Sequence, residues 1–468
     1  MRHGSGRAYG ETSGCPMNTS EGERMEGVRE DDGYEIAQSP EEADVILVNT
    51  CAIREHAERR VLGRVAQLNG LKRERPEVVI GVTGCMAQRM GDRLLARAPY
   101  VDLVMGPDGY RRLPSALRAV RPAAGRPRKR LSVLDLDPGE NYLGLEQRRR
   151  SQVTAWVPIQ RGCDHRCTFC IVPYVRGPEK NRDPRDVLAE IGEVADQGIS
   201  EVTLLGQTVN SYEHGDWTFP DLLRAVARVP GVRRVRFTSP HPNDVTPELV
   251  EAMAEEPAIC EQLHLPVQSG SNRVLKRMVR RYTAESFMEK VEMVRAGVPD
   301  IALSTDVIVG FPGESEEDFE QTLELLAEVR FDDAFTYRYS PRAGTPATRL
   351  PADQFIPDDV GQRRLETLIA ETRAVQAEIN RGEVGRLEEL LIERKGKTPG
   401  TVMGRTRRNK AAVMPGGEAD IGRYRTAHLV RTTGATFVAE PAAAVLAEPV
   451  AAVLAEPVAA VLAEPVAG

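Results

Sequence analysis

Three cysteines in one short loop are the residues of this chain best suited to chemistry. Cys163, Cys167 and Cys170 have the spacing C-x3-C-x2-C, directly after an apolar run, residues 153–160, that predicts a strand. Three thiolates that converge from one loop suit a [4Fe–4S] cluster, because iron prefers soft sulfur ligands. Since a cluster normally takes four cysteines, this one would keep an iron with an open position, where a small molecule can bind and react.

Two other interpretations of this loop are an incomplete zinc site and a disulfide with a spare thiol. Zinc would need a fourth protein ligand, and His165 lies inside the loop, from where it could hardly reach back. The spacing therefore favours the iron–sulfur interpretation.

Three further cysteines lie in the N-terminal part of the chain. Cys51 and Cys85 each follow the carboxyl end of a predicted strand, where open α/β sheets place their ligands. Glycine precedes Cys15 and Cys85, which would let the backbone approach a cofactor closely. Buried structural cysteines are the alternative, and spacing alone leaves a second cluster and this alternative equally open.

The elements that must position these cysteines predict an α/β protein. Residues 1–140 read as an N-terminal α/β domain, in which short apolar strands alternate with helices, as in a parallel sheet. We expect strands at 43–50, 78–83 and 101–105, and helices at 54–72 and 88–97. Basic residues then mark a connection between domains, at 126–130 and 148–150.

Residues 149–382 repeat strand, loop and helix six times and predict a partial (βα)6 barrel. Each strand ends in a glycine-, proline- or polar-rich loop, and barrel enzymes keep their active sites at this end. The open side of a partial barrel can admit a large substrate. The predicted strands are 153–160, 201–205, 232–238, 261–265, 301–309 and 334–339, and a long helix follows at 357–381.

Residues 383–440 contain short strands separated by glycine turns and predict a small all-β barrel. Four cations between two of these strands suit phosphate contact, although a solvated turn explains them equally well. They are Arg405, Arg407, Arg408 and Lys410. The tail, 441–468, repeats an eight-residue unit with a proline in each, which predicts low-complexity, disordered sequence.

Composition narrows the class of protein. The chain has 468 residues, 41% hydrophobic and 28% charged, with a net charge of −7, so any RNA contact must come from local basic patches. No apolar run approaches the roughly 18 residues of a membrane span. Seven cysteines without a signal sequence argue against a secreted disulfide framework. We therefore expect a cytoplasmic protein that does not contact membranes.

Together these motifs resemble the radical S-adenosylmethionine (SAM) methylthiotransferase family, over roughly residues 8–440. The segments Gly14-Cys15-Pro16-Met17-Asn18 and Asn49-Thr50-Cys51-Ala52-Ile53-Arg54-Glu55 are similar to the branch that acts on dimethylallyladenosine in tRNA. Pro16 departs from the glutamine usual in that branch and is closer to the branch that modifies ribosomal protein S12. The cysteine beside it is intact, so the departure bears on substrate choice and not on cluster binding.

The resemblance implies two [4Fe–4S] clusters and SAM as both radical source and methyl donor. Cys163, Cys167 and Cys170 would hold the SAM-binding cluster, and SAM cleavage would yield a radical that removes hydrogen from C2 of an adenine. The cysteines near the N-terminus would hold an auxiliary cluster that presents the sulfur. They are Cys15, Cys51 and Cys85.

Further residues are candidates to contact SAM by their position after barrel strands. Glycine and glutamine are common turn residues there, so each is a weak candidate, and Phe169 could equally pack within its loop. The candidates are Gly206, Gln207, Gln268, Val309, Gly310 and Phe169.

The resemblance also implies the partners. The substrate would be tRNA with dimethylallyladenosine at position 37 in the anticodon loop, whose unpaired bases can enter a pocket. The C-terminal barrel would be an RNA-binding TRAM domain that uses the four cations named above. We also expect an electron-donor protein of the flavodoxin type, and a monomer.

Three alternatives stay open. Within the same chemistry the substrate could be an aspartate of ribosomal protein S12, or threonylcarbamoyladenosine in tRNA. From another class, the chain could be a non-catalytic RNA-binding iron–sulfur sensor.

Cys260 is expected to be a core residue before the fourth barrel strand, and no spacing makes a ligand of His165, His241 or His264.

Overall fold

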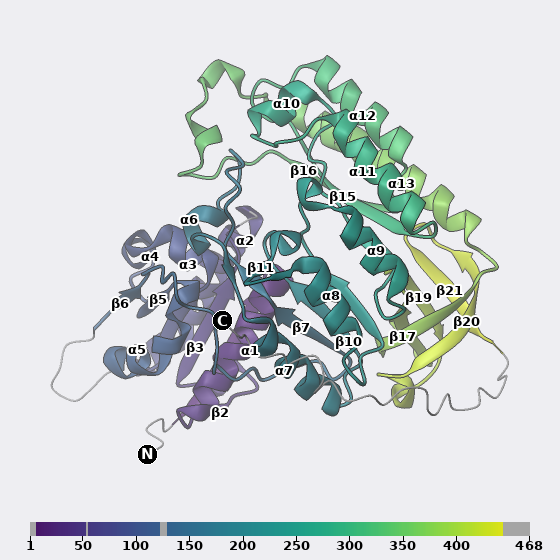
Figure 1. Ribbon diagram of the computed structural model, residues 1–468. Coiled ribbons are helices and arrows are strands. Elements are labelled where there is room, and N and C mark those ends of the chain that lie inside the picture. Colours follow the sequence, from purple (N-terminus) through teal and green to yellow (C-terminus); the bar gives the residue numbers. More distant parts are fainter. Residues whose placement is uncertain (1–5, 53–54, 122–128, 443–468) are drawn as a thin grey trace, which may run out of the picture.

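The computed structural model describes residues 6–52, 55–121 and 129–442 (Figure 1). It has an N-terminal α/β part in purple and blue, a central partial barrel in teal and green, and a small C-terminal β-barrel in yellow. The predicted α/β class, with these three architectures, is confirmed. The tail from residue 443, and residues 126–128 of the predicted basic stretch at 126–130, lie outside the described residues.

The N-terminal part is a parallel sheet of six strands in the order β2-β1-β3-β4-β5-β6. Its central strands are almost wholly apolar because helices cover both of their faces. The strands are β1 (Arg7–Ser13), β2 (Glu35–Ile36), β3 (Val45–Thr50), β4 (Val79–Thr83), β5 (Leu103–Met105) and β6 (Leu131–Val133).

Helices α1 (Pro16–Asp31) and α5 (Leu113–Val120) pack on one face of this sheet, and α2 (Glu55–Glu74), α3 (Cys85–Met90) and α4 (Asp92–Arg97) pack on the other. A single helix was expected over 88–97. The chain instead forms two helices, because Gly91 has a φ of 53° and interrupts the helical hydrogen bonds.

The central part has two parallel three-stranded sheets, β13-β10-β7 and β14-β15-β16. A parallel bridge between Val235 and Ile259 joins them, so six strands form an open barrel whose free edges are β7 and β16. The strands are β7 (Thr154–Pro158), β10 (Glu201–Leu205), β13 (Arg234–Phe237), β14 (Gln262–His264), β15 (Ala302–Val309) and β16 (Asp333–Arg338).

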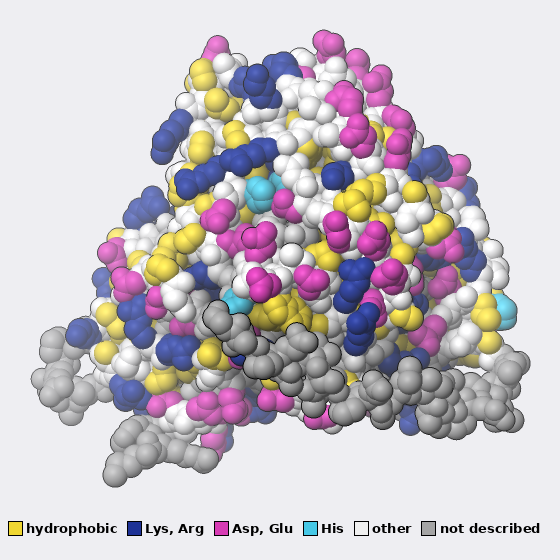
Figure 2. All heavy atoms as spheres, viewed as in Figure 1, with side chains coloured by type: hydrophobic (Ala, Val, Ile, Leu, Met, Phe, Trp, Pro, Cys, Tyr) yellow, Lys and Arg dark blue, Asp and Glu magenta, His cyan; other side chains and the backbone are white. Residues whose placement is uncertain are grey.

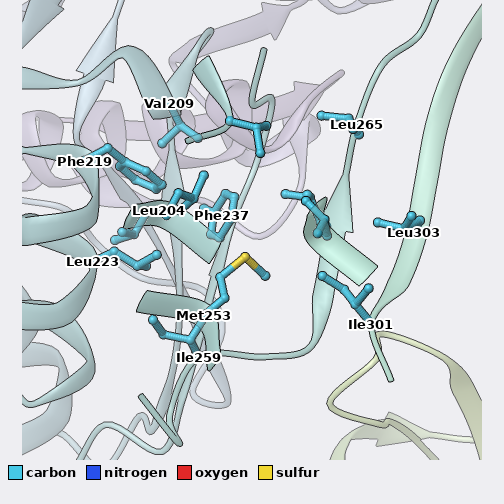
Figure 3. Packing of buried hydrophobic residues seen from close by; sticks show 14 of the residues in the cluster. Leu204, Val209, Phe219, Leu223, Phe237, Met253, Ile259, Leu265, Ile301 and Leu303 are labelled. Carbon is cyan, nitrogen blue, oxygen red and sulfur yellow. The ribbon is translucent and has the colours of Figure 1, made fainter. Parts of the chain in front are cut away.

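Helices cover the outside of the partial barrel and bury its apolar face (Figure 3). Phe219 at the start of α8 meets Phe237 of β13 edge to face, with ring centroids 5.2 Å apart. Burying each such ring contributes about 1.5–3 kcal/mol. These helices are α7 (Pro184–Asp196), α8 (Phe219–Ala227), α9 (Pro247–Glu255), α10 (Asn272–Arg277), α11 (Ala284–Gly297) and α12 (Glu316–Val329).

The long helix α13 (Asp358–Gly382) leads into a closed barrel of five strands in the order β17-β18-β19-β21-β20. Tyr424 fixes this barrel to the central part: its hydroxyl lies 3.0 Å from Ser200 Oγ, and the Arg233 guanidinium stacks on its ring at 3.7 Å. The strands are β17 (Leu387–Lys395), β18 (Thr401–Arg405), β19 (Ala411–Pro415), β20 (Tyr424–Thr432) and β21 (Thr436–Pro441). No helix among the described residues is long and apolar enough to span a bilayer.

Candidate active site

One cavity of about 1080 Å³ brings both cysteine triplets together. Its wall includes the loops after three N-terminal strands, the loop after β7, and the inner face of the partial barrel. Residues far apart in the sequence therefore share one cavity. The six cysteines that line it are Cys15, Cys51, Cys85, Cys163, Cys167 and Cys170.

The N-terminal triplet forms because β1, β3 and β4 are adjacent and parallel. Their carboxyl ends meet at one edge of the sheet, so Cys15, Cys51 and Cys85, which follow these ends, also meet. Cys15 immediately precedes helix α1, and Cys85 is the first residue of α3. The predicted position of Cys51 and Cys85 beyond strand ends is confirmed.

Two glycines permit this close approach. Gly14 has a φ of 132°, and a Cβ atom there would lie 2.6 Å from the Cys51 Cβ. Gly84 has a φ of 89°, and a Cβ atom there would lie 2.3 Å from Asn49 Oδ1. Any larger residue would push the cysteine loops apart.

The thiols of this triplet have different surroundings. A hydrogen bond with Cys51 lowers the pKa of Cys15 to about 6, against the opposing effect of burial, and the Arg176 charge and Asn18 act in the same direction. The Cys15 Sγ also lies 3.1 Å from Asn18 Oδ1. Burial raises the pKa of Cys85 to about 11, and the Arg176 guanidinium partly offsets this. At least one thiol is thus readily ionised, as metal binding requires.

The second triplet lies in the loop after β7 and the short strand β8 (Gln160–Arg161). The loop turns at Gly162, which has a φ of 79°, and a Cβ atom there would meet the Pro178 carbonyl oxygen at 1.9 Å. The Gly162 N–H donates to Gln207 Oε1 at 2.6 Å. Gln207, expected to contact SAM, therefore also holds the loop that carries the cysteines.

Polar side chains face two thiols of the second triplet. Arg280 Nη1 donates to Cys167 Sγ at 3.2 Å, and Thr208 Oγ1 lies 3.1 Å from Cys163 Sγ. Burial raises the pKa of Cys163, and raises that of Cys170 to about 12. Sequence reasoning missed Arg280, because it lies 110 residues beyond the loop it serves.

The donor set fits iron–sulfur clusters. Each triplet offers three soft sulfur ligands, and the seventh cysteine, Cys260, does not line the cavity. It is buried just before β14, as predicted. His165 does not complete a zinc site with its own loop: its ring stacks on His241 with centroids 3.9 Å apart, and its Nε2 lies 3.4 Å from Asp244 Oδ2.

The residues expected to contact SAM divide into two groups. Phe169, Gly206, Gln207 and Gln268 line the cavity, whereas Val309 and Gly310, at the end of β15, do not. Phe169 also packs on the apolar cluster of Val274, Met278 and Phe311, as its alternative role of packing predicts. A SAM contact by any of these six residues stays a prediction.

The free edges of the partial barrel carry aromatic side chains that sequence reasoning missed. Trp156 of β7 and Phe335 of β16 both line the cavity, and the Phe335 side chain is 46% exposed. Phe335 meets His264 edge to face at 5.7 Å, and His264 Nε2 lies 3.3 Å from Asp306 Oδ2. The alternation of strand residues could have identified them, because every second residue of β7 and β16 points inward.

The four predicted RNA contacts differ in their surroundings. Only Arg405 lines the cavity. Arg407 pairs with Glu261 of the barrel at 2.8 Å, and Arg408 and Lys410 are buried among carboxylates. On the face seen in Figure 2, basic side chains are interspersed with acidic ones. RNA binding by these four residues stays a prediction, and two of them, Arg407 and Lys410, also join the two barrels.

Comparisons with known proteins agree with this architecture. Residues 157–326 match the family model of the Radical SAM superfamily, residues 7–106 match Uncharacterized protein family UPF0004, and residues 381–438 match the TRAM domain. Among solved structures, the radical SAM methyltransferase TsrM from Kitasatospora setae has a TM-score of 0.53 at 16% identity, over 74% of this chain and 77% of that chain. This likeness shows a shared fold.

Curated relatives cover nearly the whole chain. A tRNA-2-methylthio-N(6)-dimethylallyladenosine synthase from Carboxydothermus hydrogenoformans is 45% identical over 422 residues, 88% of this chain and 94% of the relative. The synthase from Chloroherpeton thalassium is 42% identical over 436 residues, 92% of this chain and 95% of the relative. With its three matching domains and its two cysteine triplets, the chain belongs to the radical SAM methylthiotransferases, in the family of tRNA-2-methylthio-N(6)-dimethylallyladenosine synthases.

Proposed function

We propose that this enzyme converts N6-dimethylallyladenosine at position 37 of tRNA into its 2-methylthio derivative. The observation that carries the proposal is the single cavity lined by both cysteine triplets and by the inner wall of an open barrel. A base in this cavity would lie within reach of both cofactor sites. The relatives that carry this activity in their names match this chain over 94% and 95% of their own length.

Cys163, Cys167 and Cys170 would hold the [4Fe–4S] cluster that binds SAM, as membership of the radical SAM superfamily implies. We further propose that Cys15, Cys51 and Cys85 hold a second [4Fe–4S] cluster. When bound, these cofactors and SAM supply the hydrogen abstraction, the sulfur and the methyl group, which no side chain provides.

The protein's own contribution is to position these groups. Gly162 and Gln207 fix the loop of the second triplet, and Arg280 keeps a positive charge beside Cys167. Burial of Cys51, Cys85 and Cys167, and partial burial of the other three ligand cysteines, limits the access of water to the sulfur ligands. Such a dry, shaped site protects a reactive species from side reactions.

The base would enter through the open side of the barrel, between β7 and β16. Trp156 and Phe335 offer flat apolar faces at this opening, and RNA-binding proteins stack unpaired bases on such rings. His264 and Asp306 lie deeper on the same wall and can hydrogen bond the edge of a base. Phe335→Ala should raise the KM for tRNA more than Phe335→Leu does.

The TRAM domain would grip the RNA backbone beside this opening. Arg405 and the exposed Asn409 reach the cavity from the C-terminal barrel, so they are placed to meet a phosphate or sugar of the anticodon loop. Arg407 and Lys410 would act mainly by holding that barrel against the central part, and Arg408 by tying β17 to the end of α13. We propose in addition a flavodoxin-type electron donor, a monomeric enzyme and a cytoplasmic location, where mature tRNA is found.

The test is nucleoside mass spectrometry of tRNA from a strain in which this gene is deleted. We expect the 2-methylthio group to disappear from dimethylallyladenosine and to return with a plasmid copy. Loss of the group from threonylcarbamoyladenosine, or from ribosomal protein S12, with dimethylallyladenosine unaffected, would contradict the proposal. The three substrates need to be compared because Pro16 replaces the glutamine usual in the dimethylallyladenosine branch.

A further inference from the structure

A buried ion pair joins the two halves of the cavity. Arg176 ends helix α6 (Val172–Arg176), which directly follows the second cysteine loop, and Glu21 lies in α1, which directly follows Cys15. Arg176 Nη1 donates to Glu21 Oε1 at 2.6 Å, and Nη2 donates to Oε2 at 3.2 Å. The two side chains are 3% and 0% exposed. This bidentate geometry fixes both partners.

Two tyrosines complete the hydrogen bonds of the carboxylate. The Tyr142 hydroxyl donates to Glu21 Oε1 at 2.9 Å, and the Tyr110 hydroxyl donates to Oε2 at 3.4 Å. Burial and the Glu21 charge raise the pKa of Tyr110 well above its usual value, so this residue stays a neutral donor. Glu21 thus accepts hydrogen bonds from three buried residues, Arg176, Tyr142 and Tyr110, which makes the geometry of the pair well defined.

Arg176 also faces a cysteine of the N-terminal triplet. Helix α6 packs on α3, and Val175 shares an apolar cluster with Cys85, Ala52 and Ile171. Arg176 and Cys85 both line the cavity, and the guanidinium charge lowers the pKa of the Cys85 thiol against the larger effect of burial. In this buried setting a unit charge interacts far more strongly than it would in water.

The arginine beside the second triplet, Arg280, has different partners from Arg176. Arg280 donates to Cys167 Sγ at 3.2 Å, and its other described partners are the Tyr282 hydroxyl and the Pro266 carbonyl. Each triplet thus has one buried arginine beside one thiol. Among the contacts that the structure describes for these two arginines, only those of Arg176 include a carboxylate.

We propose that Arg176 and Glu21 are a positioning pair that sets the reduction potential of the cluster held by Cys15, Cys51 and Cys85. This inference rests on the proposed second cluster. Adding an electron makes a cluster more negative, so the Arg176 charge favours the reduced form and the Glu21 charge opposes it. Charge and hydrogen bonds near the sulfurs are among the factors that tune such potentials. Glu21 therefore limits the effect of Arg176.

The test uses the full chain with Cys163, Cys167 and Cys170 replaced by alanine, so that only the N-terminal triplet can hold a cluster. The reconstituted protein is titrated under anaerobic conditions and followed by electron paramagnetic resonance. We expect Glu21→Gln to raise the midpoint potential and Arg176→Met to lower it. Each change should shift the reduction equilibrium at least tenfold, which is about 59 mV for one electron. Arg176→Lys, which keeps the charge, should stay closer to the parent protein.

A matched control is the buried pair of Lys72 and Asp102, 2.5 Å apart at the amino end of the same sheet. Lys72→Met disturbs the same domain at the edge opposite the cysteines and should leave the potential unchanged. If Arg176→Met does not fold, Arg176→Gln replaces it, because glutamine keeps a hydrogen-bond donor without the charge.

The outcomes separate the two proposals. If the parent protein without the second triplet binds no iron, the N-terminal cluster itself is wrong and the inference falls with it. If the parent protein binds a cluster, its potential is compared with those of Glu21→Gln and of the neutral Arg176 variants. If both kinds of variant leave the midpoint potential unchanged, or shift it in the same direction, the N-terminal cluster is supported but the proposed charge effect of the pair is wrong. Shifts of opposite sign support the inference, since a loss of packing alone would not reverse sign.

Discussion

The ammonium of Lys410 lies 2.8 Å from the Glu383 carboxylate, at the junction between α13 and the C-terminal barrel. It also lies 2.7 Å from Asp332 Oδ1, and Lys410 is only 8% exposed. Removing the positive charge would leave the Asp332 carboxylate without this cation and leave Glu383 paired with Arg408 alone. We therefore expect Lys410→Met to reduce the free energy of unfolding by about 3–5 kcal/mol in denaturant titrations.

Arg405→Ala is the matched comparison, because the Arg405 side chain is 39% exposed and lines the cavity. It should change stability by less than about 1 kcal/mol yet weaken tRNA binding and lower its salt dependence. Equal stability losses in the two variants would contradict this division of roles.

The two cysteine triplets should hold separate clusters. Anaerobic reconstitution of the wild-type chain should give about eight irons and eight sulfides. The variant in which Cys15, Cys51 and Cys85 are alanine should give about four of each, because the second triplet is formed by a different loop. About four irons in both proteins would leave a single cluster and refute the N-terminal site.

The turn at Gly162 should be essential for the SAM-binding site. Gly162→Ala forces a Cβ atom against the Pro178 carbonyl oxygen in a backbone conformation that alanine rarely adopts. The loop should then fail to present its cysteines, so that iron falls from about eight to about four per chain while the N-terminal cluster remains. Gly198→Ala, also at positive φ but with open space around it, should keep both clusters.

A buried ion cluster makes stability depend on pH. Burial opposes the charge of Glu190, but Arg24, Arg182 and Arg149 outweigh it and lower its pKa to about 2, from 4.5. Above about pH 4.5 the ionised Glu190 carboxylate therefore adds on the order of 3 kcal/mol to the free energy of unfolding. This contribution is lost as the pH falls toward 2.

Glu190→Gln should therefore destabilise the cluster-free protein at pH 7 and differ progressively less from wild type as the pH falls below about 4.5, in urea titrations. Glu255→Gln, which breaks an exposed pair with Arg224, should have little effect at either pH. A Glu190→Gln effect that stays constant across this range would rule out the depressed pKa.

Much of the fold was predictable because its signals are local. The apolar runs of β3, β4 and β10, and the glycines beside Cys15 and Cys85, are visible without a structure. Strand β1 escaped prediction because its sequence, Arg7–Ser13, is largely polar or small. It still joins the sheet, since its backbone pairs with β3 along six residues and tertiary context overrides propensity.

The site was predictable only where its chemistry is carried by closely spaced residues. The C-x3-C-x2-C loop is such a case, whereas Arg280 and Phe335 reach the cavity through the fold alone, and only the fold brings Arg176 to Glu21. Contacts between distant segments also explain why the role of the basic cluster in the C-terminal barrel was not predictable. Arg408 and Lys410 look like phosphate contacts in the sequence, but their carboxylate partners come from other segments that the sequence does not place beside them.

The most direct test of the account is product formation by the purified, reconstituted enzyme with tRNA that carries dimethylallyladenosine, SAM and a chemical reductant. We predict that the wild-type chain forms 2-methylthio-dimethylallyladenosine, detected by mass spectrometry of digested tRNA. The variant without Cys15, Cys51 and Cys85 should still cleave SAM but leave the nucleoside without sulfur. Methylthiolation by that variant at the wild-type level would contradict this mechanism. So would a wild-type protein that holds both clusters and cleaves SAM but forms no methylthiolated nucleoside.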